Sequence, residues 1–339
     1  MTASTPLTIT SAADPRSASA ISRWSRMYGA GLGRMLYGLL VPLTGIAVFL
    51  LMWSFAATRI DTSLGTFPGP VAVLEQFQSL YAEHRAERAR AQLFYQRQEE
   101  RNAKRLAADP DYHAKVRAYT GKETFLDQIA TSLVTVTCGF LLAALIAIPL
   151  GIAVGLSRTL HRAVNPIIQV FKPVSPLAWL PLVTMVVSAL YVAPDPMVAK
   201  SFINSMITVT LCCLWPMLIN TSVGVAGIDE DLLNVSRVLR LPTYKHVQKI
   251  VLPASIPMIF TGMRLSLGVA WMVLIAAEML AQNPGLGKFV WDEFQNGSSE
   301  SLSRIMAAVL VIGLIGFLLD RGMLQLQRAV SWDGASATR

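Results

Sequence analysis

Residues 227–251 read GIDEDLLNVSRVLRLPTYKHVQKIV, a polar loop held between two long apolar runs. Three acids, Asp229, Glu230 and Asp231, open the stretch, and four bases follow them. Carboxylates favour the positive N-terminal end of a helix and cations its C-terminal end, so this polarity predicts a short helix. Its apolar residues recur at helical spacing: Leu232, Leu233, Val235, Val238 and Leu239. The stretch therefore predicts a small amphipathic knob, carried by a membrane domain and shaped to dock into a soluble partner.

The composition is that of a polytopic membrane protein. The 339 residues are 53% hydrophobic and 15% charged, with a mean hydropathy of +0.48. The formal net charge is +8, but the excess bases lie in the N-terminal tail and short loops, where membrane topology accounts for them. The three cysteines lie inside apolar runs without metal or disulfide spacing. We therefore expect no cofactor, no metal site and no nucleic-acid partner.

Six apolar runs are long enough to cross a bilayer. We expect them near residues 36–57, 129–156, 164–190, 202–224, 256–281 and 305–327. The first is interpreted as a retained helix rather than a cleaved signal. The predicted fold class is an all-α polytopic membrane protein. Its predicted parts are a disordered cytoplasmic tail (1–33), a first transmembrane helix (34–58), a helical extracytoplasmic insertion (59–124), a membrane core (125–327) and a cytoplasmic tail (328–339).

Basic residues set the expected orientation, because cytoplasmic loops carry an excess of Lys and Arg. Bases precede the first helix, fill the short loop at 158–162 and follow the acids of the knob. The opposing loops, 191–201 and 282–304, carry acids against fewer bases. Both termini and the knob are therefore predicted on the cytoplasmic side.

The insertion contains a long predicted helix. Residues 71–107 are rich in Ala, Glu, Gln and Arg, and Pro110 is expected to end the helix. A second short helix is predicted from Asp111 to Tyr119. Two interpretations stay open: a docking platform for an outer partner, and a solvated helical hairpin packed on its own subunit.

The densest group of helix breakers is KPVSPLAWLP at 172–181, at membrane depth. Breaks in spanning helices are tolerated where the freed backbone is buried in protein or lines an aqueous cavity. The stretch is interpreted either as a kinked, partly unwound segment beside a solute path, or as a bent packing helix. The path interpretation includes Ser175 and Trp179.

Polar residues inside the predicted spans are candidates for the path, because each is costly in a membrane unless paired or solvated. Fourteen residues separate Arg264 from Glu278, a rise of about 21 Å, so the two cannot pair. Glu278 either lines the path or fastens a neighbouring helix. Arg264 either attracts an anion or anchors the loop at 227–253, and we favour the anchor. The fourth span adds neutral donors that suit a weakly hydrated oxyanion or a neighbouring helix: Asn204, Ser205, Trp215, Asn220 and Thr221.

Enzymatic motifs are absent from the sequence. Residues 285–288 (GLGK) lack the spacing and the hydroxyl of a phosphate-binding loop, and there is no zinc motif or Ser/His/Asp set. We expect a non-catalytic chain that does not bind ATP itself. Two other classes stay open: an intramembrane enzyme using Glu278 and Asp320, and a membrane scaffold whose knob recruits a signalling partner.

The loop also carries a resemblance. It resembles the cytoplasmic coupling loop of ABC-transporter permeases, whose pattern is Glu-Ala-Ala, three residues, Gly, nine residues, Ile, one residue, Leu-Pro. Ile250, Leu252 and Pro253 fit this pattern, whereas Arg240 stands at the glycine position and 234–236 (NVS) replace Glu-Ala-Ala. In the nitrate branch of the nitrate/sulfonate/taurine permeases, Asn-Val-Ser/Ala-Arg is the usual form of this coupling motif. Further segments resemble that branch: 172–182 (KPVSPLAWLPL), 214–221 (LWPMLINT), 231–241 (DLLNVSRVLRL), 262–280 (GMRLSLGVAWMVLIAAEML), 285–297 (GLGKFVWDEFQNG) and 318–323 (LLDRGM).

The resemblance implies the permease subunit of a type I importer in the bacterial inner membrane, for nitrate and possibly nitrite. Implied partners are ATP-binding subunits, an extracytoplasmic nitrate-binding protein, a second permease copy and membrane lipids. Another small anion stays open: cyanate, bicarbonate, a sulfonate or taurine. The implied contacts to the ATPase subunit are Asp229, Glu230, Asp231, Leu232, Asn234, Val235, Ser236, Arg237, Arg240, Ile250, Leu252 and Pro253.

Overall fold

The computed structural model describes residues 38, 40–62, 65–109, 112–114, 116–192, 198–298 and 300–330. It divides into two compact units, Met1–Thr62 and Ser63–Arg339. The first unit contains an 18-residue apolar helix, Leu40–Ala57, whose side chains are almost all exposed within it. Two strands of two residues each follow, β1 (Asp61–Thr62) and β2 (Gly65–Thr66). The predicted disordered tail at 1–33 lies outside the described residues.

Three long helices form the centre of the second unit. They are α3 (Phe125–Leu156), α6 (Lys200–Ala226) and α9 (Leu252–Ala281), and α6 packs along both of the others. Glycine allows the close approach of α3 to α6, since a Cβ at Gly151 would lie 2.6 Å from the Cβ of Thr221. Hydroxyl groups add bonds between the helices, such as Ser266 Oγ donating to the Cys213 carbonyl at 2.7 Å.

The helices match the predicted spans with one correction. Among the described residues, five helices are long and apolar enough to cross a membrane, or six if a bent pair counts as one span. The predicted run at 164–190 is interrupted at its predicted helix breakers, but its two parts, α4 (Arg158–Phe171) and α5 (Pro176–Leu190), are bent by 101° and do not continue as one kinked span. Proline accounts for the break, since Pro173 and Pro176 lack the N–H of a continuing helix. Ser175 then caps α5 by accepting from the Leu177 amide at 3.3 Å.

The insertion is one long helix with an extended return. The predicted helix at 71–107 is confirmed as α2 (Pro70–Ala108), of 39 residues. The predicted second helix from Asp111 to Tyr119 is wrong, because residues 112–114 and 116–120 are not helical. Side chains of α2 hold this return segment in place of helical bonds. Gln98 Oε1 accepts from the Arg117 amide at 2.9 Å, and the rings of Phe94 and Tyr119 lie 5.4 Å apart.

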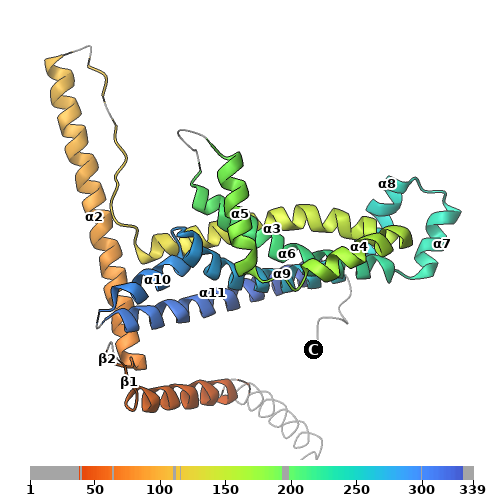
Figure 1. Cartoon of the computed structure of the whole chain (residues 1–339), viewed down its shortest axis with the longest axis horizontal. Helices are drawn as coiled ribbons and strands as arrows, with labels where there is room; N and C mark the ends of the chain where they lie inside the picture. Colours follow the sequence, from red (N-terminus) through yellow and green to blue (C-terminus); the bar gives the residue numbers. More distant parts are fainter. Residues whose placement is uncertain are drawn as a thin grey trace, which may run out of the picture. The chain divides into compact units, whose positions relative to one another are not determined.

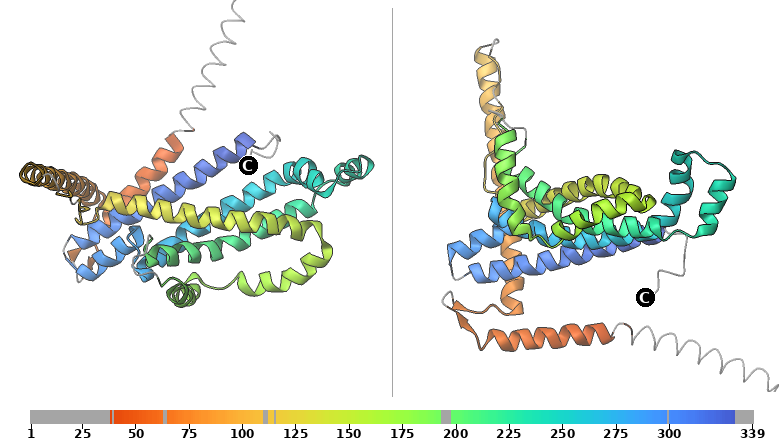
Figure 2. Two further views of the ribbon diagram at one scale, coloured as in Figure 1. Left: turned by 90° about the horizontal axis from the view of Figure 1, so that it is seen from above. Right: turned by 45° about the vertical axis from the view of Figure 1, so that its right-hand side comes forward.

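The remaining helices lie at opposite ends of α9 (Figure 1). At its start lie α7 (Glu230–Val238), α8 (Thr243–His246) and the five-residue π-helix η1 (Val247–Val251), and α7 and α8 stand apart from the bundle (Figure 2). At its far end α10 (Leu286–Asn296) packs on α9 and on α11 (Ser301–Val330). The far end is also where α2 contacts α11 and α3. One helix of 30 residues, α9, therefore extends from the predicted knob to α10.

Candidate functional site

The predicted knob forms as an amphipathic helix. Asp229 Oδ1 accepts from the Asp231 amide at 2.9 Å and caps α7, with Glu230 and Asp231 in the first turn and Arg237 in the last. Arg237 also donates to Asn234 Oδ1 at 2.8 Å. Charges and cap thus stabilise the helix in the polarity that the sequence predicts.

The end of α7 explains the unusual residue in the loop. The Leu241 amide donates to the Ser236 carbonyl at 3.2 Å and the Arg240 amide to the Arg237 carbonyl at 3.1 Å, which is the Schellman arrangement. Its C′ residue must adopt the left-handed conformation, and Arg240 does so with φ of 46°. Glycine is favoured there because it has no Cβ. The position at which the family pattern has glycine is therefore the left-handed terminus of this helix.

The apolar face of the knob is divided between core and surface. Leu233 packs with a buried cluster of Val225, Ile228 and Val251. On the exposed side, Leu232, Val235, Val238 and Leu239 have 45%, 51%, 80% and 63% of their surface accessible. A short charged helix with four apolar side chains in solvent is suited to insertion into a complementary surface.

The knob is fastened to α9. The Ser236 hydroxyl and His246 Nδ1 lie 2.7 Å apart and join α7 to α8. The π-helix η1 then leads directly into α9, where Leu252 and Pro253 form the first turn. Ile250 is half-buried and Val251 is fully buried. Because no loop intervenes between His246 and α9, a displacement of the knob is transmitted to the long helix.

Aromatic rings surround the break between α4 and α5. Phe171 stacks on Trp179 of α5, with ring centroids 5.7 Å apart, and on Trp215 of α6 at 5.9 Å and 7° between planes. The indole Nε1 of Trp215 is buried and has no hydrogen-bond partner among the described residues. Ser175 and Trp179 therefore lie at the same break as Trp215, and their place on a solute path stays a prediction.

The other predicted path residues do not gather at that break. Asn204 is buried near the start of α6, and its Oδ1 has no partner among the described residues. Asn220 donates to the Pro216 carbonyl of its own helix at 2.8 Å. The predicted donors thus extend along α6 rather than forming one pocket.

Glu278 fastens three helices. Its side chain is fully buried in α9. It accepts from Ser132 Oγ of α3 at 2.8 Å and from the Gly287 amide of α10 at 2.9 Å, while Ser132 Oγ accepts from the Leu286 amide at 2.9 Å. The carboxylate therefore lies at the N-terminus of α10, where backbone amides favour negative charge. A Cβ at Gly285 would overlap this carboxylate, so the adjoining glycine permits the approach.

Arg264 pairs with α11. Its Nε and Nη2 donate to the two carboxylate oxygens of Asp320 at 2.5 and 2.8 Å. The pair borders a cavity of about 210 Å³ with a mainly apolar lining. Because Asp320 neutralises the guanidinium, Arg264 does not present a free charge to an anion, and its bidentate partner lies in α11 rather than in the loop at 227–253.

Comparison with known proteins identifies the group to which the chain belongs. Residues 147–332 match the family of binding-protein-dependent transport system inner membrane components, and this match covers more than half of the chain. The chain belongs to this family. It is therefore a multi-pass membrane component of a transport system, as the resemblance predicts.

Named relatives transport small anions. The chain is 37% identical over 292 residues to the bicarbonate transport system permease protein CmpB of Synechococcus elongatus, covering 86% of the chain and 89% of the relative. It is 40% identical over 193 residues to the nitrate import permease protein NrtB of Leptolyngbya laminosa, covering 57% and 64%. The taurine transport system permease protein TauC of Escherichia coli is 30% identical over 226 residues, covering 65% and 77%.

A solved structure shares the fold. The MetNI methionine ABC transporter in an inward-facing conformation matches with a TM-score of 0.53 and 15% identity, over 60% of this chain and 95% of that one. The predicted fold class, an all-α type I ABC importer permease, is confirmed. A partner for the insertion helix α2 remains a prediction.

Some residues that fasten the helices and the knob were not predicted from the sequence. Ser132 and Asp320 are the partners of the two intramembrane charges, and His246 fastens the knob. The sequence indicates Asp320 only as a residue of the alternative intramembrane enzyme. The glycines at 285 and 287 were a usable signal for Glu278, because paired glycines beside a buried acid indicate a close approach to backbone amides.

Proposed function

We propose that this chain is the permease subunit of an ATP-driven importer for nitrate. It forms the translocation path with a second copy of itself in the inner membrane, with both termini in the cytoplasm. ATP is hydrolysed by partner subunits that bind the knob. An extracytoplasmic binding protein delivers the anion, which is consistent with a family whose transport depends on such proteins.

The observation that carries this proposal is the exposed apolar face of α7 at the start of α9. A docked subunit covers Leu232 and Val235 and pulls on a helix that is continuous as far as Glu278. Glu278 then joins the movement to α3 and α10, and Arg264 joins it to α11. The bundle is thereby suited to turn as one rigid body when the ATPase subunits close.

Nitrate is favoured as substrate by a neutral donor at the break between α4 and α5. Trp215 Nε1 provides a buried N–H without a fixed charge and without a partner among the described residues, which suits an anion that must be bound weakly and released. Arg264 is neutralised by Asp320, so tight binding by a cation is not expected. The nitrate import permease NrtB, at 40% identity, supports the same assignment.

Bicarbonate is the second candidate, because the CmpB match extends over 86% of the chain. The test reconstitutes the complete transporter with its ATPase subunits and binding protein in proteoliposomes, and measures ATP-dependent uptake of labelled nitrate against excess bicarbonate, nitrite, cyanate and taurine. We expect nitrate uptake that bicarbonate does not inhibit. Uptake of labelled bicarbonate that excess nitrate does not inhibit would assign bicarbonate as the substrate instead. Uptake that does not depend on ATP would contradict the importer mechanism.

A further inference from the structure

The insertion helix α2 extends away from the bundle (Figure 1) and carries an excess of basic residues toward its C-terminal end. Between residues 90 and 105 there are five bases and two acids. A shallow groove along this part of the helix is lined by Arg90, Leu93, Phe94, Arg97, Glu100 and Arg101. A second groove against the return segment shares Phe94 and Arg101 and adds Arg105 and Arg117. The two grooves form one continuous surface, which we call the arginine groove.

Two cations of the arginine groove are available to a partner. Arg97 and Arg101 are exposed, and neither forms a salt bridge within the described part of the chain. Leu93 is 50% exposed on the same side, and Phe94 contributes an aromatic floor. Arginines around an apolar floor are characteristic of protein interfaces, where Arg and aromatic side chains are enriched.

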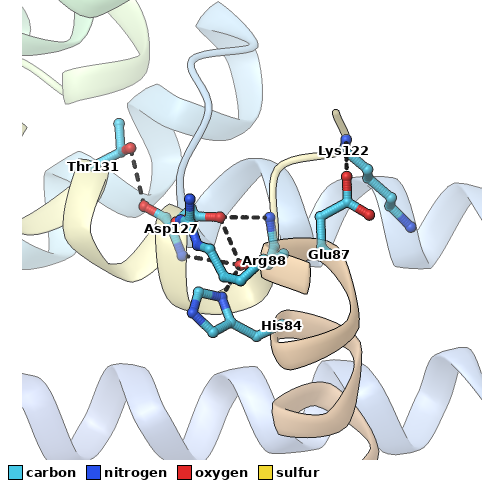
Figure 3. Close-up of polar contacts among 7 residues, drawn as sticks. His84, Glu87, Arg88, Lys122, Asp127 and Thr131 are labelled. Carbon is cyan, nitrogen blue, oxygen red and sulfur yellow. Dashed lines mark hydrogen bonds and ion pairs between the residues drawn. The ribbon is translucent and has the colours of Figure 1, made fainter. Parts of the chain in front are cut away.

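The helix α2 with its return segment, which we call the arm, is rigidly attached to the bundle. At its base Arg88 forms an ion pair with Asp127, and His84 Nδ1 lies 2.6 Å from Thr124 Oγ1 (Figure 3). Thr124 and Asp127 also form the capping box that begins α3. On the other side, Arg304 of α11 bonds to Glu83 at 2.7 Å. A partner bound to the arm is therefore held in a fixed position relative to α3 and α11.

The return segment keeps the arginine groove open in one shape. Glu87 Oε1 accepts from the Tyr119 hydroxyl at 2.8 Å and from the Lys122 amide at 3.1 Å. The Tyr95 hydroxyl accepts from the Tyr119 amide at 3.1 Å. Because the segment is fixed along α2, the groove is preformed and little ordering is needed when a partner binds.

We propose that the arginine groove is the docking surface for an acidic face of the extracytoplasmic binding protein. This proposal rests on the proposed function, which places the insertion on the outer side. The family to which the chain belongs transports with binding proteins, so a protein partner is required on that side. A lone small anion gains little in so exposed a groove, because salt screens it within about 8 Å. A protein with several carboxylates engages the whole row of arginines at once.

The test measures association of the binding protein with the complete transporter in nanodiscs of zwitterionic lipid. The variants are Arg97→Glu and Arg101→Glu. The matched control is Arg85→Glu, which makes the same charge change on the same helix but on a face rotated about 120° from Arg97 at 3.6 residues per turn. Basal ATPase activity without the binding protein reports whether each variant is folded.

We expect each groove variant to lower the association rate at least about tenfold and to reduce its salt dependence, since rim charges act chiefly on encounter. The control should change the rate less than twofold. Replacing acids by lysine on the binding protein should restore association with Arg97→Glu. Unchanged association, or an equal loss in Arg85→Glu, overturns the proposal. The same measurements are repeated in nanodiscs of anionic lipid, and a loss confined to those nanodiscs also overturns the proposal, because the arm would then bind lipid. The assay is independent of which anion is transported, so a failed nitrate assignment leaves its result intact.

Discussion

Replacing Ser132 by alanine tests the buried network that joins α3, α9 and α10. The hydroxyl donates to Glu278 and accepts from the Leu286 amide, and all three residues are fully buried. The variant removes a charge-assisted bond, of about 1.5–3 kcal/mol, and leaves a buried amide without an acceptor, at about 1–3 kcal/mol. Hydrogen bonds between membrane helices contribute less, with averages near 0.6 kcal/mol. We therefore expect a loss of about 2–4 kcal/mol in the free energy of unfolding.

The measurement is the free energy of unfolding by SDS titration in mixed micelles. Ser205→Ala is the matched control, because Ser205 is also fully buried but its hydroxyl has no partner among the described residues. That control should change the free energy by less than about 0.5 kcal/mol. A loss in Ser132→Ala no greater than in the control would refute the assignment. A double-mutant cycle with Glu278→Gln should give a coupling energy of at least about 0.5 kcal/mol, because the two residues share one bond.

Four further predictions concern the ion pair, the knob and the arm. Arg264→Ala should slow uptake more than it changes anion preference, and the reversed pair, Arg264→Asp combined with Asp320→Arg, should be faster than Arg264→Asp alone; a switch in selectivity would show instead that Arg264 binds substrate. Arg240→Gly should leave ATPase-subunit affinity intact and stabilise the loop by up to about 1 kcal/mol, whereas Arg240→Val should destabilise it, as hydrogen exchange of the loop would report. Deletion of 229–240 should preserve membrane insertion and abolish co-purification of the ATPase subunit; retained co-purification would contradict the docking role. The Arg304 guanidinium of α11, which donates to Glu83, holds the pKa of Glu83 below its usual value. This contact therefore stabilises the attachment of the arm above pH about 4.5, and the stabilisation is lost as the pH falls through the lowered pKa. Spin-label distances between the arm and the bundle should lengthen over that pH range.

Local patterns predicted most of the fold because the determining interactions are local. Apolar runs long enough to cross a bilayer predicted the ends of the spans within a few residues, and the order of acids and bases predicted the helix α7. The break at 172–175 was predicted from proline, which acts on its own helix. Its consequence, a bend of 101° rather than a kinked span, depends on where α4 and α5 pack and is not encoded in the break itself.

Pairings between distant residues could not be predicted from one sequence. Ser132 and Glu278 are 146 positions apart, and Arg264 and Asp320 are 56 apart. Composition indicates that each charge needs a partner but not which helix supplies it. The prediction of a second helix in the return segment failed for a related reason. It has adequate helical propensity, but its tyrosine and backbone amides bond to Glu87, Tyr95 and Gln98 of the neighbouring helix.

Under the proposed function, the position of α9 lets one subunit respond both to a binding protein and to an ATPase subunit. A bundle whose helices moved separately would dissipate a displacement at either end. Here the base of the arm and the start of α3 are joined through Asp127, and α3 is joined through Ser132 to Glu278 at the far end of α9. The other end of α9 continues without a loop into η1 and the knob. In the proposed importer, a binding protein on the arm and an ATPase subunit on the knob therefore act on the same rigid element. Mutations that loosen Ser132 or Glu278 should then uncouple ATP hydrolysis from the binding protein before they prevent either partner from binding.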